Sequence, residues 1–282
     1  MSLPAIGLLF LSAALHTFWN LLLKQAGGKY IATFWTVVLS GLIFAPVLFF
    51  TGLPPRSQWP LLLISAIVEV AYFLSLSQAY QDHDFSLIYP VARGTAPAFL
   101  TLWSILILGE RLTRGGAAGL ALIVIGLMVA GGSSYLAGGV PPRRALVLAL
   151  LTALFISIYS FIDGFAVKHG PTVSYAIGIF TLIPILITPF VLLRYPRALL
   201  QQELSANWKR LALIAVLGVC SYILALTAYA LAPLSYAGAI REVSVVFGAF
   251  AGWRLLGEKM GGARLFGAAI IFAGILMIAL FG

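Results

Sequence analysis

The chain has 282 residues, of which 62% are hydrophobic and only 9% are charged. A soluble domain is about 45 to 50% apolar and about 25% charged, so this composition excludes a soluble protein and predicts one embedded in a membrane. The net charge of +9 would suggest nucleic acid as a partner of a soluble chain, but here the basic residues mostly flank apolar tracts, where they contact lipid headgroups. We therefore expect membrane lipids, and no nucleic acid, as partners.

Ten apolar tracts follow one another along the chain. Each is about twenty residues long, which suits a membrane-spanning helix and not a strand of an outer-membrane barrel. The first lacks the basic start and cleavage site of a signal peptide, so we keep it as a helix of the mature protein. The hydrophilic stretch 194–210 is expected to form a surface helix at the membrane interface. The predicted spans are 3–23, 31–51, 60–80, 86–108, 116–132, 145–167, 174–194, 211–231, 235–256 and 263–281.

A linker rich in Gly, Ser and Pro divides these spans into two sets of five. Because five is odd, the second set enters the membrane from the opposite side, which is the inverted-topology repeat common among transporters. Internal similarity supports the repeat, because Arg93 and Arg241, like Glu110 and Glu258, are 148 residues apart. We predict an all-α membrane protein of ten transmembrane helices arranged as two inverted five-helix repeats. The parts are 1–132, the linker 133–144, and 145–282.

Five ionisable residues fall well inside the predicted spans: Glu69, Arg93, Asp163, Arg241 and Glu242. Each costs about 2.5 to 3.5 kcal/mol near the bilayer centre if it has no partner, so we expect them to be paired, hydrated or both. From their depths in the spans, Asp163 is the expected partner of Arg241, and Glu69 that of Arg93. Glu242 follows Arg241 directly and so points about 100° round the helix, which makes it an ion-pair candidate outside the pocket wall of Arg241.

Two interpretations of these charges stay open. In the first, Arg93 and Arg241 line a central cavity and hold an anionic group of the substrate, while Glu69 or Asp163 serves proton coupling. In the second, the charges form structural ion pairs between helices. Aromatic and amide side chains at helical spacing would supply the rest of a cavity wall. The candidate substrate-binding residues are Arg93, Arg241, Tyr89, His16, Trp19, Asn20, Tyr72 and Tyr159.

Other patterns in the sequence indicate structural roles for two glutamates and argue against a metal site or an enzyme. Glu110 and Glu258 lie between the last two spans of each half, where a carboxylate can accept hydrogen bonds from helix N-terminal amides, so we expect structural roles. One cysteine and three histidines without a ligand spacing predict no metal site, and we expect no cofactor. The absence of GxSxG, HExxH and spaced carboxylate pairs argues against an enzyme, and the absence of GxxxxGK[ST] against direct use of ATP.

The doubled Leu-Gly-Glu-(Arg/Lys) motif, at 108–111 and 256–259, is followed each time by a short glycine-rich helix. This pattern resembles the drug/metabolite transporter superfamily, specifically its ten-helix EamA-type members, over essentially the whole chain. The resemblance implies a multi-pass protein of the bacterial inner membrane that exports amino acids, other metabolites or toxic compounds. Related phosphate exchangers have basic residues on the fourth and ninth helices, which carry Arg93 and Arg241 here, but this chain lacks their lysine-rich pattern.

Together these features predict a secondary active transporter or exporter of a small polar metabolite, an amino acid or related carboxylate. We expect alternating access, protons as a candidate coupling ion, and a monomer or homodimer. The alternatives are a flippase for a lipid-linked intermediate, whose polar faces would open to lipid, and a non-transporting scaffold subunit. Orientation is open, because the distribution of basic residues places both termini outside whereas the resemblance implies that they are cytoplasmic.

Overall fold

The computed structural model describes residues 1–24, 26, 28–82, 85–138, 143–256 and 262–282, and the regular structure within these ranges is helical. The elements are α1 (Leu3–Lys24), α2 (Lys29–Phe44), η1 (Ala45–Val47), α3 (Leu48–Thr51), η2 (Arg56–Gln58), α4 (Trp59–Asp82), α5 (Phe85–Leu108), α6 (Arg114–Gly138), α7 (Arg143–Lys168), α8 (Thr172–Arg194), α9 (Arg197–Leu231), α10 (Leu234–Arg241), α11 (Val243–Leu256) and α12 (Gly262–Phe281).

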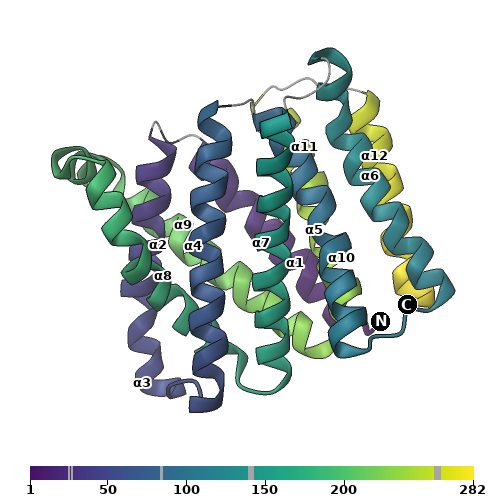
Figure 1. Ribbon diagram of the computed structural model, residues 1–282, viewed down its shortest axis with the longest axis horizontal. Coiled ribbons are helices and arrows are strands. Elements are labelled where there is room, and N and C mark those ends of the chain that lie inside the picture. Colours follow the sequence, from purple (N-terminus) through teal and green to yellow (C-terminus); the bar gives the residue numbers. More distant parts are fainter. Residues whose placement is uncertain (25, 27, 83–84, 139–142, 257–261) are drawn as a thin grey trace.

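The helices account for the ten predicted spans. The second span consists of α2, η1 and α3, and the ninth is divided into α10 and α11 (Figure 1). Seven helices in the described part of the chain are long and apolar enough to cross a membrane, and shorter apolar helices at 92–108 and 114–130 belong to α5 and α6. The prediction of an all-α membrane fold with ten transmembrane helices is confirmed.

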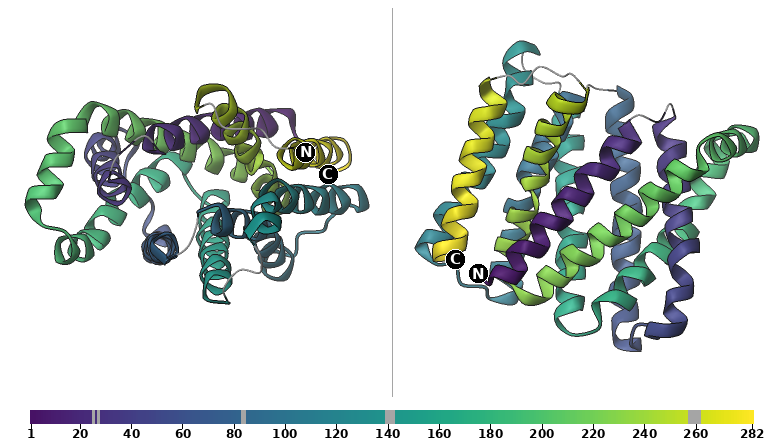
Figure 2. Two further views of the ribbon diagram at one scale, coloured as in Figure 1. Left: turned by 90° about the horizontal axis from the view of Figure 1, so that it is seen from above. Right: turned by 180° about the vertical axis from the view of Figure 1, so that it is seen from behind.

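Two predicted boundaries are wrong. The fifth span was expected to end near residue 132, but α6 continues to Gly138. The surface helix expected at 194–210 is not a separate element, because α9 runs without interruption over 35 residues. At 1.5 Å per residue α9 is about 52 Å long, well beyond the roughly 30 Å of a hydrocarbon core. Its first turns therefore project past the rest of the bundle, as Figure 2 shows.

The two halves enter the bundle from opposite ends. Both termini lie at one end of the molecule, where the Met1 amino group donates a hydrogen bond of 3.0 Å to the Gly282 carbonyl oxygen (Figure 1). Helix α1 starts at this end, whereas α7, the first helix of the second half, starts at the opposite end (Figures 1 and 2). The five-helix repeats are thus inverted relative to each other.

The packing of the helices repeats across the two halves. Helix α1 packs along α9, and its counterpart α7 packs along α4 in the same way. Helix α7 also packs against α5, as α1 does against α10 and α11. The last helices of the halves, α6 and α12, lie side by side (Figures 1 and 2). Each half therefore completes the other, and the charged residues of the spans lie where they meet.

Glycines make the close contact between α6 and α12 possible. A Cβ on Gly119 would lie 2.7 Å from the carbonyl oxygen of Gly274, and one on Gly126 would lie 2.8 Å from that of Gly267. The two halves are offset by 148 residues, so Gly119 corresponds to Gly267 and Gly126 corresponds to Gly274. Each glycine of α6 therefore faces the counterpart of the other one. Small residues let helix backbones approach closely in a membrane, where burial of apolar surface gives little drive for association.

Candidate functional site: the charged centre of the bundle

The five charged residues of the spans are all buried, and we call them the charged centre. None is more than 9% exposed. They lie on four helices and the break between α10 and α11: Glu69 on α4, Arg93 on α5, Asp163 on α7, Arg241 at the end of α10, and Glu242 in the break. The centre is therefore built from both halves, inside the bundle.

The partner of Arg93 is Glu242 and not Glu69, so that predicted pairing is wrong. Arg93 Nε lies 3.0 Å from Glu242 Oε2, and Arg93 Nη2 donates a hydrogen bond of 3.3 Å to Ser244 Oγ. The Nε contact is ionic, because its geometry is not that of a hydrogen bond. The prediction used depth along the span, which fixes height in the membrane but not the direction in which a side chain points.

The break at Glu242 turns its side chain toward the first half of the chain. Helix α10 ends at Arg241, and the Glu242 N–H donates to the carbonyl oxygens of Ala239 and Ile240. This tight turn is the irregularity that separates α10 from α11 in the middle of the ninth span. On α1, Thr17 Oγ1 donates a hydrogen bond of 3.0 Å to the Ser244 carbonyl oxygen, just beyond the break.

Tyr222 of α9 connects the remaining charges. Its hydroxyl donates to Asp163 Oδ2 and lies 3.3 Å from Glu69 Oε1. The guanidinium carbon of Arg241 lies 5.6 Å from the centre of the Tyr222 ring, within the range of a cation–π contact. Asp163 Oδ1 accepts a second hydrogen bond, of 2.8 Å, from the Tyr175 hydroxyl. The expected ion pair between Asp163 and Arg241 is replaced by this indirect link.

Arg241 has no ion pair with an acidic side chain among the residues that the structure describes. Its Nε is buried and has no hydrogen-bond partner there. Its electrostatic neighbours include Arg93 and the tyrosines at positions 159, 222 and 229, and the carboxyl groups of Glu69, Asp163 and Glu242 are within electrostatic range. The repeat explains this difference from Arg93. At the offset of 148, the counterpart of Glu242 is Gly94, which supplies no carboxylate.

Most of the other predicted site residues lie near the charged centre. His16 is within electrostatic range of both arginines, and its ring packs edge-on against Trp19 with centroids 5.0 Å apart. Tyr72 and Tyr159 pack together with ring centroids 5.9 Å apart. Asn20 instead donates a hydrogen bond of 2.7 Å to the His16 carbonyl oxygen, one turn earlier in α1. The side chain of Tyr89 is outside the described part, so its role stays a prediction.

Glu110 links the two halves at the end of the molecule where the termini lie. Its carboxylate accepts hydrogen bonds from the backbone N–H groups of Leu234 (2.7 Å) and Ser235 (3.1 Å) and from Ser235 Oγ (2.7 Å). Lys168 Nζ lies 3.7 Å from the same carboxylate. Glu110 therefore caps the N-terminus of α10, whose other end carries Arg241. Glu258 lies outside the described residues.

Sequence reasoning missed three side chains that organise the centre: Tyr222, Tyr175 and Ser244. A signal existed for Tyr222, because Ala71-Tyr-Phe-Leu parallels Ser221-Tyr-Ile-Leu and makes it the counterpart of Tyr72. Tyr175 lies twelve residues after its partner Asp163, in the next span, and no spacing rule connects them. Ser244 depends on the helix break, which no proline marks.

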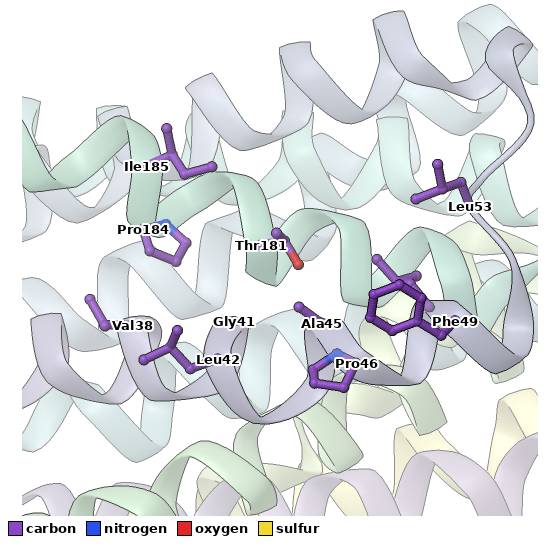
Figure 3. A pocket seen from close by; sticks show the side chains of 11 residues that line it. Val38, Gly41, Leu42, Ala45, Pro46, Phe49, Leu53, Thr181, Pro184 and Ile185 are labelled. Atoms are coloured by element: carbon purple, nitrogen blue, oxygen red, sulfur yellow. The ribbon is translucent and has the colours of Figure 1, made fainter.

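A separate apolar groove opens on the outside of the bundle, away from the charged centre. It has a volume of about 660 Å³ and lies between the second span and α8 (Figure 3). Thr181 is the polar side chain among those that line it. Phe49 at its rim is 91% exposed. The Thr181 hydroxyl donates to the Ile177 carbonyl oxygen of its own helix, so this surface suits contact with lipid chains.

Comparisons with known proteins agree with this architecture. A family model described as the EamA-like transporter family matches residues 3–132 and 143–280. Among solved structures, 28 chains match. One, described only as a crystal structure of a protein, is 18% identical with a TM-score of 0.81, and the alignment covers 98% of this chain and 97% of that one. This likeness shows the fold alone. No curated protein matches.

Proposed function

Because the chain belongs to the EamA-like transporter family, we propose that it is a secondary active exporter of a small polar metabolite that carries a carboxylate, such as an amino acid. It works by alternating access in the bacterial inner membrane. The observation that carries this proposal is Arg241, a buried arginine in a membrane span whose charge no acidic side chain of the described chain pairs with directly.

The chemistry of Arg241 suits a carboxylate. A guanidinium group presents parallel N–H donors that match the two oxygens of a carboxylate, and a charge inside a membrane bundle needs a compensating partner. Arg93 already has such a partner in Glu242. We therefore assign the anion-binding role to Arg241 and a structural role to Arg93.

The surroundings of Arg241 suit a small solute. Arg241 lies over the ring of Tyr222, and Tyr159 and Tyr229 are within electrostatic range, so aromatic rings near the guanidinium group can pack against an apolar part of a substrate. His16 is half-buried and lies within electrostatic range of Arg93 and Arg241. We propose that His16, Trp19, Asn20, Tyr72 and Tyr89 form the rest of the substrate path.

The break between α10 and α11 supports alternating access. Transporters of this architecture bind substrates near discontinuous helices at the interface of inverted repeats, where one repeat rocks against the other. Arg241 lies at such a break. The flippase alternative is less well supported, because the charged centre is buried within the bundle and the groove that faces outward is apolar.

The test is a thermal-shift screen of the purified protein in detergent against glycine, glutamate, succinate, phosphate and choline. A ligand that binds only the folded state stabilises it by about 2.7 kcal/mol at a hundredfold excess over its Kd, so a substrate raises the melting temperature. We expect a carboxylate compound to stabilise the wild type but not Arg241→Gln.

Arg254→Gln is the matched control, because Arg254 lies on the same span but is exposed. It should keep the full response to the carboxylate. Stabilisation by choline alone, or a carboxylate response that survives in Arg241→Gln, would show that Arg241 is not the anion-binding group. A stabilising compound would then be tested for counterflow in proteoliposomes.

A further inference from the structure

We propose that Glu69 and Asp163 together bind one exchangeable proton, which they share through the hydroxyl group of Tyr222. This pair is the site at which proton movement is coupled to transport. Its role in transport rests on the proposed function, whereas the binding of the proton itself does not.

The hydrogen bonds of Tyr222 require a proton at this site. The hydroxyl lies within hydrogen-bond distance of both Glu69 Oε1 and Asp163 Oδ2, but a phenol has only one hydrogen to donate. If both carboxylates were ionised, one would face an oxygen lone pair. With one added proton the chain is complete: a protonated Glu69 donates to the Tyr222 oxygen, and Tyr222 donates to Asp163.

The balance of charge also indicates that the site binds one proton. The groups around the pair are Ser65 and Tyr72 on α4, Tyr159 on α7, Tyr175 on α8, Tyr222 on α9 and Arg241 on α10. Helix α5, which also packs against α7, contributes Arg93, which is within electrostatic range of Tyr159. Among these described residues Arg241 is the cation without a direct ion pair, since Glu242 compensates Arg93. In the absence of a bound substrate, two carboxylates and one arginine leave one negative charge, which a single proton neutralises, and an uncompensated charge at this depth is costly.

Ser65 is a further polar group beside the pair. Its side chain is completely buried, and its hydroxyl lies within interaction range of the Asp163 carboxylate and the Tyr175 hydroxyl. Ser65 also lies one helical turn before Glu69, on the same face of α4. A rotatable hydroxyl at this place can donate to a carboxyl oxygen when the proton moves along or leaves the chain of oxygens.

The position of the pair explains how a proton would act on the transporter. Glu69 belongs to the first half and Asp163 to the second, on helices α4 and α7, which pack against each other. The shared proton therefore joins the two halves, and its loss leaves two facing carboxylates that repel. Arg241 also lies over the ring of Tyr222, so the proton site and the anion site share the side chain of Tyr222.

The test is infrared difference spectroscopy of the purified protein as the pH is raised through the neutral range. The wild type should show the stretching band of one protonated buried carboxyl group, which disappears at high pH. Glu69→Gln and Asp163→Asn should each remove the whole band, because the remaining carboxylate is balanced by Arg241. Glu203→Gln, in the first turns of α9 outside the charged centre, should leave it unchanged.

A second readout needs no band assignment. If the folded protein holds one more proton than the unfolded chain, raising the pH lowers its melting temperature, and this dependence should be absent in Glu69→Gln.

Tyr222→Phe keeps the ring but removes the hydroxyl, so it should shift the infrared band of the protonated carboxyl group. A wild type without the band, a band that only one of the two substitutions removes, or a band that sodium removes at constant pH would each overturn the proposal.

These readouts separate the two proposals, because neither uses a substrate. A failed ligand screen with an intact proton band would contradict the assignment of Arg241 alone. A missing band together with carboxylate binding that depends on Arg241 would contradict the proton site alone.

Discussion

Glu242 and Gly94 occupy equivalent positions in the two halves, and this difference separates the roles of the two buried arginines. Arg93 has a carboxylate at 3.0 Å, whereas Arg241 lies over the ring of Tyr222. A glycine at position 94 also fits the packing, because a Cβ there would lie 3.1 Å from Met128 Sδ. The repeat therefore supplies two cations but only one direct counter-ion, which leaves the other arginine for a ligand.

The pair between Arg93 and Glu242 should be energetically coupled. Breaking a buried ion pair by removing one partner costs about 3 to 5 kcal/mol, because the other charge stays buried. We expect Arg93→Gln and Glu242→Gln each to lower the apparent melting temperature in detergent, and the double variant to lower it by less than their sum. The coupling should be about 1 to 3 kcal/mol.

A surface pair on α9 provides the control for this cycle. Asn207 Nδ2 donates a hydrogen bond of 3.0 Å to Glu203 Oε1 between two half-buried side chains in the first turns of the helix. The cycle Asn207→Ala with Glu203→Gln should give coupling below about 1 kcal/mol. Additive effects of the Arg93 and Glu242 substitutions would contradict the ion pair as the main interaction of either side chain.

The sequence predicts which residues form the charged centre better than it predicts their contacts. Arg93, Arg241, Glu69, Asp163 and Glu242 stand out because a charge within an apolar span is costly. Their pairing depends on rotation about each helix and on the break after Arg241, and neither has a local signature. The partner of Arg93 could therefore not be found by counting residues from the membrane surface.

At the scale of elements, α10 is held at both ends by the other half of the chain. Glu110 caps its N-terminus, and the ion pair of Glu242 with Arg93 holds the turn at its C-terminus. This short helix carries Arg241, so its position sets the position of the anion site. The spans themselves could be predicted from apolar length, but the division of the ninth span could not, because the charged residues Arg241 and Glu242 are compatible with a continuous helix and no proline or glycine marks a break between them.

The contact between α6 and α12 should depend on its glycines. Gly119→Val places side-chain atoms where the Gly274 carbonyl oxygen lies, so the helices must separate. Overpacking of this kind typically costs about 1 to 3 kcal/mol, and we expect a lower apparent melting temperature. Gly218→Val is the control, because nothing lies within 4 Å of a Cβ at that position of α9. Equal effects of the two substitutions would show that the glycines do not set this contact.

At the scale of the whole molecule, the inverted repeat fixes which loops share a face of the membrane. Five spans in each half place the turn after α3 and the turn after α7 on the face of the termini, and the turn between α8 and α9 on the opposite face (Figure 1). The sequence predicts this arrangement from the number of spans and the offset between halves. Which face of the bundle lies in the cytoplasm is a separate property. The distribution of basic residues places the termini outside, whereas the family resemblance implies that they are cytoplasmic.

Cysteine labelling tests the arrangement and the orientation together. Cys220 is the single cysteine, so Cys220→Ala gives a background without thiols. Leu53→Cys and His169→Cys lie at exposed positions on the face of the termini, and Arg197→Cys at an exposed position on the other face. In intact cells an impermeant thiol reagent should label either the first two variants or the third, and in inverted vesicles the reverse. Labelling of all three from the same side would contradict the inverted repeat. Labelling of Leu53→Cys and His169→Cys in intact cells would place both termini outside, as the positive-inside rule predicts, whereas labelling of Arg197→Cys would place them in the cytoplasm.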